Sequence, residues 1–347
     1  MKDFSKHIIY SHQSIEEALL RLNSFSGKDE LTLFVLNEQN ILVGTVTDGD
    51  IRRGLLKAKS IEDRIEKIMF RNFRFLLKDR ISPQQIAQFR QDEIYLLPII
   101  DEYGRVLRVV NLNETKSLLP LEVVLMAGGR GERLKPLTNH TPKPLLKVGE
   151  KPILEHNIDR LITYGIDNFY ISVRYLSDLI TEYCKKFEVN INYIHEEVPL
   201  GTIGAVALIE QFHYDTVLVM NADLLTNIDL EDFYMSFLRQ KADLSVAAIP
   251  YNVNIPYAVL ETKDEQILSL HEKPTYTYHS NAGIYLIKNY LLEHIPKNQF
   301  YNATDFIDAM IKKGYKVCYY PILTYWLDIG KPEDFEKAQE DIKYLHL

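Results

Sequence analysis

The chain has 347 residues, of which 46% are hydrophobic and 25% charged, typical of a globular protein with room for about two domains. The formal net charge of −8 and the lack of a long basic block argue against nucleic-acid binding. No apolar run approaches the length that crosses a membrane, so we expect no membrane contact. Cys184 and Cys318 lack metal-binding spacing and predict reduced thiols in a cytoplasmic protein.

The first third of the chain contains an internal repeat. Residues 36–47 align with residues 100–111 at an offset of 64, and their apolar positions coincide. Each copy reads as a helix, two strands joined by a short polar turn, and a second helix. Ser14 and Glu17 have the spacing of a capping box at the first helix, and a Ser-Pro pair ending at Pro83 opens its counterpart. One unit of about 55 residues buries little surface alone, so we expect the two copies to pack together.

This repeat resembles a tandem pair of CBS domains, modules that commonly bind adenine nucleotides, with domains at residues 1–60 and 61–118. The likeness is strongest where a strand meets a helix, in the segment Thr-Val-Thr-Asp-Gly-Asp that ends at Asp50. The resemblance implies that Thr47 and Asp50 hold the phosphate and ribose of a regulatory adenine nucleotide. It also implies a homo-oligomer, because CBS pairs often dimerise.

The second copy departs from this pattern. It carries Asn111 and Glu114 at the positions equivalent to Thr47 and Asp50. Glutamate is longer than aspartate and asparagine does not simply replace a hydroxyl, which argues against a second nucleotide site. A purely structural or dimerising pair is the alternative to a nucleotide sensor. Residues 116–121 are predicted to form a short joint, in which Pro120 ends the last helix of the repeat before the next strand begins.

A glycine-rich loop follows a predicted buried strand that ends at Met126. Gly128, Gly129 and Gly131 let the backbone bend and bring N–H groups close to a ligand, and Arg133 adds a cation. Backbone donors and guanidinium groups both match phosphate oxygens, so the loop suits a polyphosphate. It lacks the third glycine of a dinucleotide-binding turn, and the chain contains no P-loop string.

The loop resembles the signature of nucleotide-sugar pyrophosphorylases, G-G-x-G-x-R-L-x-P-L-T, and every fixed letter of that signature is present. The resemblance implies that the loop binds a nucleoside triphosphate through Ala127, Gly128, Gly129 and Gly131. It implies a catalytic role for Arg133, which would hold the triphosphate.

Two further motifs match the same family. Lys143 lies between two prolines, which hold the backbone extended and aim the side chain, and the resemblance places this lysine on the phosphates as a catalytic residue. Residues 199–205 read as a glycine turn entering a helix and resemble the family's P-L-G-T-A-G-A. The resemblance gives nucleotide contacts to Gly201, Thr202 and Gly204.

Helices and strands alternate after the loop. This order predicts an α/β, Rossmann-like nucleotidyltransferase domain over residues 121–347, with a mixed, largely parallel sheet and ligands at the carboxyl ends of its strands. The predicted elements are a helix from Pro152 to Gly165, a strand at 169–173, a helix at 177–187, a strand at 191–195 and a last helix from Pro332 to about Tyr344.

Two aspartates suggest a metal site. Asp223 follows a mostly apolar predicted strand, where the alternative reading is a helix cap. Asp328 lies in a Trp-x-Asp-x-Gly segment that resembles a second motif of the family. Mg²⁺ prefers a few carboxylates together with phosphate oxygens and water. The resemblance therefore implies that Asp223 and Asp328 bind Mg²⁺.

The sugar side is predicted from a hairpin over residues 257–271 that ends in the family's E-K-P motif. The family usually has glycine where Ala258 sits, so a methyl group is expected to crowd the sugar pocket. An N-A-G-I-Y segment then matches the next sugar-side strand. The resemblance implies sugar binding by Glu272, Asn281 and Gly283, and a catalytic role for Lys273 on the sugar phosphate.

Together these motifs predict a Mg²⁺-dependent sugar-1-phosphate nucleotidyltransferase, regulated through the CBS pair. Its substrates would be a nucleoside triphosphate and a sugar-1-phosphate, and its products a nucleotide-sugar and pyrophosphate. Overall likeness favours GTP, although no single residue distinguishes guanine from uracil or thymine at this point. The alternative is a catalytically silent sensor of nucleotides or nucleotide-sugars.

Overall fold

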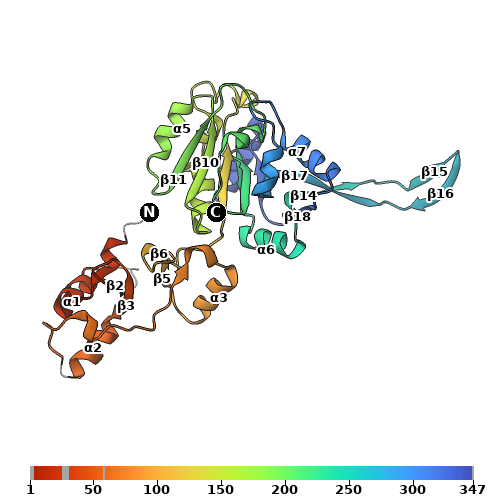
Figure 1. Ribbon diagram of the computed structural model, residues 1–347. Coiled ribbons are helices and arrows are strands. Elements are labelled where there is room, and N and C mark those ends of the chain that lie inside the picture. Colours follow the sequence, from red (N-terminus) through yellow and green to blue (C-terminus); the bar gives the residue numbers. More distant parts are fainter. Residues whose placement is uncertain (1–3, 26–30, 58, 346–347) are drawn as a thin grey trace. The chain divides into compact units, whose positions relative to one another are not determined.

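The computed structural model describes residues 4–25, 31–57 and 59–345. They divide into two compact units. The first runs to Pro120 and includes Thr163–Gly165, and the second comprises Leu121–Ile162 and the chain from Ile166 onward (Figure 1). No helix among the described residues combines the length and the apolar character needed to cross a bilayer.

The first unit contains two small sheets with the same topology, in the orders β1-β2-β3 and β4-β5-β6. In each sheet the first strand pairs parallel to the second, and the second pairs antiparallel to the third. Both antiparallel pairs have a register shift, at Val35/Leu36 and at Ile99/Ile100, which matches the offset of the sequence repeat. The elements are β1 (Ile8–Tyr10), α1 (Ile15–Asn23), β2 (Thr32–Leu36), β3 (Leu42–Thr47), α2 (Asp48–Leu56), β4 (Leu76–Leu77), α3 (Pro83–Gln91), β5 (Leu96–Ile100) and β6 (Val106–Asn111).

The two copies pack against each other, as the repeat predicts. Phe34, Leu36 and Leu42 of the first copy form a buried cluster with Ile100 of the second. The Leu42 N–H also donates to the Gly104 carbonyl at 2.9 Å. Burial of large apolar side chains between the two copies of the repeat stabilises them, because each copy alone is too small to bury much surface.

The capping box predicted for the first copy is confirmed. One helix predicted for the second copy is absent. The Ser14 hydroxyl accepts from the Glu17 N–H at 3.1 Å, and the Glu17 carboxylate accepts from the Ser14 N–H at 2.7 Å. The prediction of a helix after β6 is wrong. The Asn111 side chain accepts from the Asn113 N–H at 2.9 Å, and such a local turn competes with helix formation.

The second unit is built on one mixed, largely parallel sheet, as predicted. Within residues 121–345, all of which the structure describes, seven strands follow the order β11-β10-β7-β12-β17-β14-β18, and only β17 runs antiparallel to its neighbours. The strands are β7 (Glu122–Met126), β10 (Asn168–Val173), β11 (Asn190–His195), β12 (Thr216–Asn221), β14 (Leu244–Asn254), β17 (Thr275–Lys288) and β18 (Val317–Pro321).

The sheet is covered on both faces. In β12, Thr216 to Met220 are all buried, which is typical of a central strand between helical layers. On one face, Val217 and Val219 belong to a core cluster that includes Phe306 and Met310 of α7. The helices and remaining short strands of this unit are α4 (Ile153–Thr163), α5 (Ser177–Cys184), α6 (Leu230–Gln240), α7 (Ala303–Lys312), α8 (Pro332–Asp341), β8 (Lys147–Val148), β9 (Lys151–Pro152), β13 (Leu224–Thr226) and β19 (Trp326–Asp328).

Three predicted helices differ from the observed ones at their ends. Pro152 pairs with Lys147 in the β8–β9 hairpin, so α4 starts one residue later. Helix α5 ends at Cys184 rather than at residue 187, and α8 ends at Asp341 rather than near Tyr344. Helix ends fray, and capping sets them less sharply than burial sets the helix centre.

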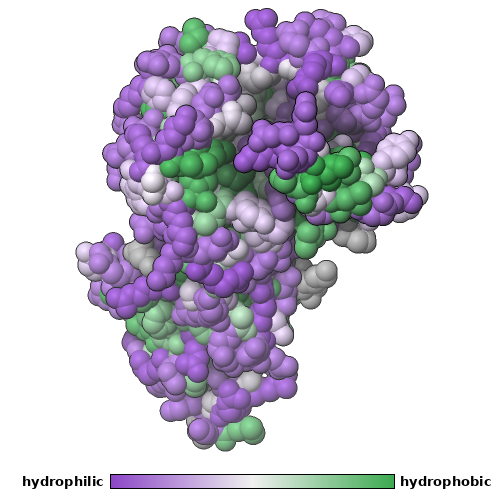
Figure 2. All heavy atoms as spheres, turned by 90° about the vertical axis from the view of Figure 1, so that its right-hand side faces the viewer, coloured by the Kyte–Doolittle hydropathy of each residue, from purple (hydrophilic) through white to green (hydrophobic). Residues whose placement is uncertain are grey.

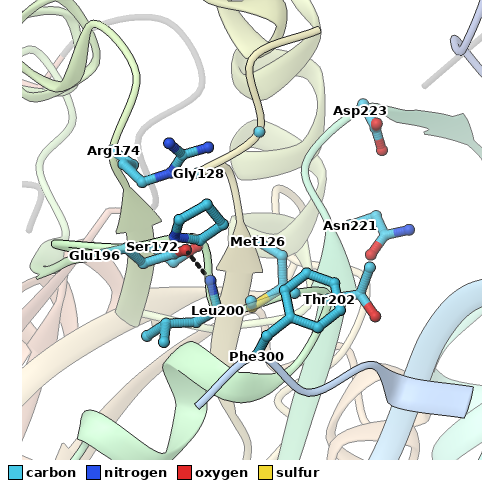
Figure 3. A pocket seen from close by; sticks show the side chains of 13 residues that line it. Met126, Gly128, Ser172, Arg174, Glu196, Leu200, Thr202, Asn221, Asp223 and Phe300 are labelled. Carbon is cyan, nitrogen blue, oxygen red and sulfur yellow. Dashed lines mark hydrogen bonds between the residues drawn. The ribbon is translucent and has the colours of Figure 1, made fainter. Parts of the chain in front are cut away.

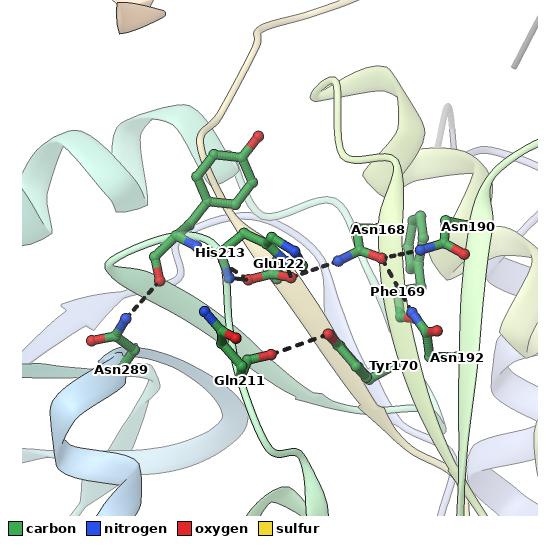
Figure 4. A network of polar contacts seen from close by, with 10 residues as sticks. Glu122, Asn168, Phe169, Tyr170, Asn190, Asn192, Gln211, His213 and Asn289 are labelled. Atoms are coloured by element: carbon green, nitrogen blue, oxygen red, sulfur yellow. Dashed lines mark hydrogen bonds and ion pairs between the residues drawn. The ribbon is translucent and has the colours of Figure 1, made fainter. Parts of the chain in front are cut away.

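A buried carboxylate ties strand ends together at the amino end of the sheet (Figure 4). Glu122 at the start of β7 is fully buried. Its oxygens accept from the Asn168 amide, from the His213 backbone N–H and from the Tyr214 N–H, the last at 3.2 Å. Because a buried charge needs such partners, this network fixes β7 relative to β10 and to the segment before β12.

Strands β14 and β17 continue beyond the sheet as a two-stranded ribbon, residues 251–280 (Figure 1). The predicted hairpin forms its tip, where β15 (Val259–Lys263) pairs antiparallel with β16 (Gln266–His271). The tip turn has Asp264 at φ 47° and Glu265 at φ 65°, as expected for a tight hairpin turn with two left-handed residues.

Candidate active site

The carboxyl ends of β7, β10, β11 and β12 border a cavity of about 240 Å³. Backbone hydrogen bonds hold these strand ends together: the Ala127 N–H donates to the Ser172 carbonyl at 3.1 Å, and the Ala222 N–H donates to the Met126 carbonyl at 3.1 Å. The cavity lies where ligands were predicted, at the carboxyl ends of the parallel strands.

The predicted glycine loop forms one wall of this cavity. A Cβ at Gly128 would lie 2.4 Å from Glu196 Oε1, and Gly131 has a φ of 62° and its Cβ would lie 3.1 Å from Lys143 Cβ. Nothing comes within 4 Å of a Cβ at Gly129, which lines the cavity with Gly128. Two glycines are therefore needed for close packing and backbone conformation, and Gly129 leaves the wall open to a ligand.

The second glycine turn forms another wall. Gly201 has a φ of 79°, and a Cβ there would lie 2.5 Å from the Tyr301 carbonyl oxygen. The Thr202 hydroxyl accepts from the Ala303 N–H at 2.8 Å and so anchors the start of α7. Gly201 and Thr202 line the cavity, whereas Gly204 is buried outside its lining. The helix predicted to follow this turn is present as a short 3-10 helix over Gly204–Leu208.

Asp223 and Asp328 come together through the β13–β19 pairing. Leu224 is opposite Asp328 in the antiparallel register, and the Ile329 N–H donates to the Asp223 carbonyl at 3.2 Å. The two carboxylates that the sequence places far apart therefore share one edge of the site, and Asp223 lines the cavity. The helix-cap reading of Asp223 is wrong, because β13 and not a helix follows it.

Lys143 lies between these two carboxylates. Lys143 is buried, with 9% of the residue exposed. Its ammonium group donates to Asp223 Oδ2 and lies 3.8 Å from Asp328 Oδ1. Burial and the neighbouring Asp223 charge raise the pKa of Asp328, and the Lys143 and Arg133 cations oppose that rise. Asp223 Oδ1 is buried without a hydrogen-bond partner. The cluster thus places two carboxylates around one buried lysine, with Arg133 as a second cation near Asp328.

Several lining residues were missed by the sequence reasoning (Figure 3). Arg174 directly follows β10, and its Nε atom is buried without a hydrogen-bond partner. Asn221 ends β12, and Phe300 reaches the cavity from the segment before α7. The position of Arg174 and Asn221 at strand carboxyl ends was a usable signal, because side chains there face the ligand edge of an α/β sheet.

Glu196 is the most informative of the missed residues. It directly follows β11, is 7% exposed and lines the cavity (Figure 3). Its Oε2 accepts from the Leu200 N–H at 3.1 Å, which fixes the carboxylate, and Oε1 lies against Gly128. A carboxylate offers about four acceptor positions and no donor, so this group can accept further hydrogen bonds from a ligand.

The predicted sugar-side residues lie in two places. Gly283 has a φ of 72°, and a Cβ there would lie 2.6 Å from the Asn221 amide, next to the cavity. Asn281 is exposed and its Oδ1 accepts from the Gly283 N–H at 2.9 Å. Glu272 and Lys273 are exposed on the ribbon. Neither belongs to the described residues that line the cavity. Ala258 is exposed on the ribbon as well, so its methyl group does not crowd the cavity of its own chain.

In the first unit, Thr47 and Asp50 form a reciprocal helix cap. Asp50 Oδ2 accepts from the Thr47 N–H at 2.9 Å and from its hydroxyl at 2.7 Å, and Asp50 Oδ1 pairs with Arg53 at 2.6 Å. Both side chains therefore have partners at the start of α2 in this structure. A ligand that binds them must exchange these hydrogen bonds.

Comparison with known proteins agrees with this geometry. Residues 122–344 match the family described as Nucleotidyl transferase, and residues 4–57 match the family described as CBS domain. The chain is 29% identical over 234 residues to D-glycero-alpha-D-manno-heptose 1-phosphate guanylyltransferase from Aneurinibacillus thermoaerophilus, covering 65% of this chain and 99% of that protein. It is 28% identical over 226 residues to mannose-1-phosphate guanyltransferase beta-A from Xenopus laevis, covering 62% of each.

A solved structure shows the same fold. HddC from Yersinia pseudotuberculosis aligns with a TM-score of 0.51 and 28% identity, over 64% of this chain and 99% of that one. Some other relatives are longer, and the chain spans 54% of the bifunctional protein GlmU from Methanocaldococcus jannaschii. Because the family match extends over most of the chain and contains both the glycine loop and the acid pair, the chain belongs to the nucleotidyl transferase family and carries a CBS domain in its N-terminal part.

Proposed function

We propose that this chain transfers a nucleoside monophosphate from a nucleoside triphosphate to a sugar-1-phosphate. The observation that carries the proposal is the cluster of Lys143, Asp223 and Asp328 beside a cavity walled by glycine backbone. Backbone donors and cations suit the phosphates, and paired carboxylates suit a divalent metal ion. The match to the Nucleotidyl transferase family supports the same reaction class.

The acid pair fits Mg²⁺. Asp223 Oδ1 is buried and lacks a partner, and Asp328 is a second carboxylate in the same cluster. Within the part of the chain that the structure describes, no three His, Cys, Asp or Glu side chains gather in metal-binding geometry. Mg²⁺ is commonly held by one or two carboxylates and completed by phosphate oxygens and water, so the acid pair is a sufficient protein contribution. When bound, it would neutralise charge on the triphosphate.

The proposed reaction is an in-line displacement. A phosphate oxygen of the sugar-1-phosphate attacks the α-phosphorus, a new P–O bond forms, and the bond to the β-bridging oxygen breaks, so pyrophosphate leaves with the electron pair. The chain contributes position and charge: Arg133, Lys143 and Arg174 would hold triphosphate oxygens, and Lys273 would hold the attacking phosphate. No protein nucleophile is required.

The base is proposed to be guanine, and Glu196 is the reason. The Watson–Crick edge of guanine has two adjacent N–H donors, which match an acceptor-only carboxylate. Uracil and thymine instead have one donor between two acceptors, and a carboxylate leaves those acceptors unpaired. Glu196 is buried in the cavity wall with lone pairs to spare, which supports GTP as the preferred triphosphate.

A matrix of four triphosphates against several sugar-1-phosphates, read by pyrophosphate release, tests the reaction. We expect one triphosphate and one sugar class to stand out. Lys143→Ala should lower kcat by about 10²–10³, as expected for loss of one charge-stabilising group. Lys147→Ala, which removes an exposed lysine in β8, is the matched control and should retain turnover. Nucleotide binding without release in any combination would favour the silent sensor instead.

We also propose that the CBS domain binds an adenine nucleotide next to Thr47 and Asp50 and alters apparent substrate affinity. Support comes from the CBS match over residues 4–57 and from the position of both side chains at the start of α2. Coupling of about 1–3 kcal/mol would change substrate affinity by roughly 5-fold to 150-fold. The matching assignment of residues 61–118 as a second CBS domain rests on the repeated sheet topology.

Calorimetry with AMP, ADP and ATP tests this regulation. Asp50→Ala should abolish binding while basal turnover stays near that of the native chain. Because the substitution also removes a helix cap, Glu17→Ala in the capping box of α1 is the control and should keep binding. Calorimetry that detects no adenine nucleotide on the whole chain would leave the pair as a structural module.

A further inference from the structure

Most residues of the ribbon, all along its length, are exposed. In β17 the residues up to Asn281 are exposed, and those from Ala282 to Ile287 are buried. In β14 exposure begins at Tyr251. A two-stranded ribbon with no core is marginally stable alone, so its length calls for a surface that covers it.

The stem of the ribbon has one apolar and one polar face. Tyr251 is opposite Tyr278 and Val253 is opposite Tyr276, so these four side chains share a face. On the other face, asparagine and threonine side chains pair across the strands through hydrogen bonds of 2.7 and 2.8 Å. Antiparallel strands with this alternation normally bury the apolar face.

The tip repeats the pattern. Leu260 is opposite Leu270, and Leu268 is the unpaired residue at the register shift between β15 and β16; Leu268 is 64% and Leu270 58% exposed. On the opposite face the Ser269 hydroxyl donates to the Glu261 carboxylate at 2.6 Å. Several exposed aromatic and leucine side chains on one ribbon indicate a surface that contacts another protein chain. The ribbon carries four carboxylates and two lysines, so it does not suit the phosphates of a nucleic acid or membrane.

The complementary surface lies on the same chain. At the root of the ribbon, β14, β18 and α7 border an apolar hollow of about 470 Å³ lined by Val246, Ala248, Ile307, Ile311 and Tyr319 among others. Figure 2 looks from the side toward which the ribbon extends and shows apolar atoms gathered in patches on this face. One chain thus carries both an apolar ribbon and an apolar hollow. Two copies related by a two-fold axis can each cover the other's ribbon.

Lys273 lies in the bend between β16 and β17, at a φ of 43°. Within its own described chain the side chain is exposed, and its neighbour Glu272 is exposed as well. Lys273, which the proposed reaction places on the sugar phosphate, is therefore not among the described residues that line the cavity of its own chain.

We propose that the ribbon packs against a second copy of this chain and brings Glu272 and Lys273 to the sugar side of that copy's cavity. Each active site is then built from two chains. This inference rests on the proposed function, which assigns Lys273 to the sugar phosphate. It adds that Lys273 acts in the cavity of the second copy and not in the cavity of its own chain.

Complementation between two inactive variants tests the exchange. Chains with Lys143→Ala and chains with Lys273→Ala are co-expressed with different tags, and the mixed dimer is purified over both tags. Each variant alone should lose about 10²–10³ in kcat. The mixed dimer has one site with an intact Lys143 and an intact Lys273 from the other chain, so about half of the native activity returns. No return of activity, or an active Lys273→Ala homodimer, would overturn the proposal.

Light scattering tests the dimer without relying on activity, which separates this proposal from the proposed function. The native chain should have twice the mass of one chain. A double variant, Leu268→Asp with Leu270→Asp, should shift to the monomer and lose activity, because both are large apolar side chains exposed at the tip of the ribbon. Leu179→Asp, which changes an exposed leucine of α5, is the control and should remain dimeric. A monomeric native chain, or a double variant with native mass and activity, would contradict the exchange.

Discussion

Replacing Glu196 by glutamine tests how the site selects its base. The change keeps the size of the side chain and removes its charge. The carboxylate is held by the Leu200 N–H at 3.1 Å and packs against Gly128, so the amide will occupy the same position. It then presents one acceptor and one donor where the native side chain presents only acceptors. In the proposed binding mode, guanine would then lose one of its two hydrogen bonds to this side chain, and one of its N–H donors would face the amide N–H donor.

The size of the effect follows from the hydrogen bonds involved. A good bidentate contact to a base discriminates by about 1–3 kcal/mol. Loss of that contact should lower kcat/KM for GTP by about 5-fold to 150-fold, since each 1.4 kcal/mol is a factor of ten. UTP and TTP should be used better than by the native chain, because an amide pairs with their adjacent donor and acceptor. The ratio of kcat/KM for GTP to kcat/KM for UTP therefore falls by the factor lost for GTP multiplied by the factor gained for UTP.

Competition assays with equal GTP and UTP measure this preference directly. Product nucleotide-sugars are separated and counted for the native chain, for Glu196→Gln and for Glu197→Gln. Glu197 is the adjacent, exposed glutamate, so its variant controls for loss of a charge nearby and should keep the native preference. An unchanged GTP to UTP ratio in Glu196→Gln would refute base reading by this carboxylate.

Three other predictions concern packing and ionisation. Glu122→Ala should lower the free energy of unfolding by about 1–3 kcal/mol in urea titrations, because the Asn168 amide and the His213 and Tyr214 backbone N–H groups lose their acceptor, and an unchanged free energy of unfolding would contradict the network. Gly131→Ala should lower activity and stability, since φ is 62° and the site is crowded, whereas Gly129→Ala, with open space around it, should keep stability within about 0.5 kcal/mol by thermal unfolding. Burial raises the pKa of Cys184 to about 11, so the folded thiol keeps its proton above the pH at which an unfolded one ionises. The free energy of unfolding should then fall as the pH rises from 9 to 11, by at most about 1.4 kcal/mol per pH unit. In denaturation curves measured across this range, Cys184→Ala should lack that part of the pH dependence.

Local signals predicted much of the fold. The capping box at Ser14 and the Pro83 start of α3 are set by residues within one helical turn, and both are confirmed. The repeat offset of 64 reappears in the register shifts of two sheets, because each copy folds by the same local pattern. The helix expected after β6 fails, since the Asn111 side chain forms a turn in its place.

The site was predictable where a motif carried the residues together. Lys143, Asp223 and Asp328 were each singled out, and the structure brings them into one cluster. Arg174 and Glu196 were missed, since neither belongs to a motif and their role depends on which strand ends are adjacent in the sheet. The position of Lys273 was also beyond local signals, because the path of a long ribbon depends on what covers it.

Transfer of a labelled α-phosphate is the most direct test of the central claim. GTP labelled at the α-phosphorus is incubated with Mg²⁺, the native chain and sugar-1-phosphates of the mannose and heptose types, and the products are separated. We predict that the label appears in a nucleotide-sugar in amounts equal to the pyrophosphate released, and that Asp223→Asn lowers this yield by about 10²–10³. Label that remains in GTP with every sugar-1-phosphate, while the chain still binds GTP, would contradict nucleotidyl transfer.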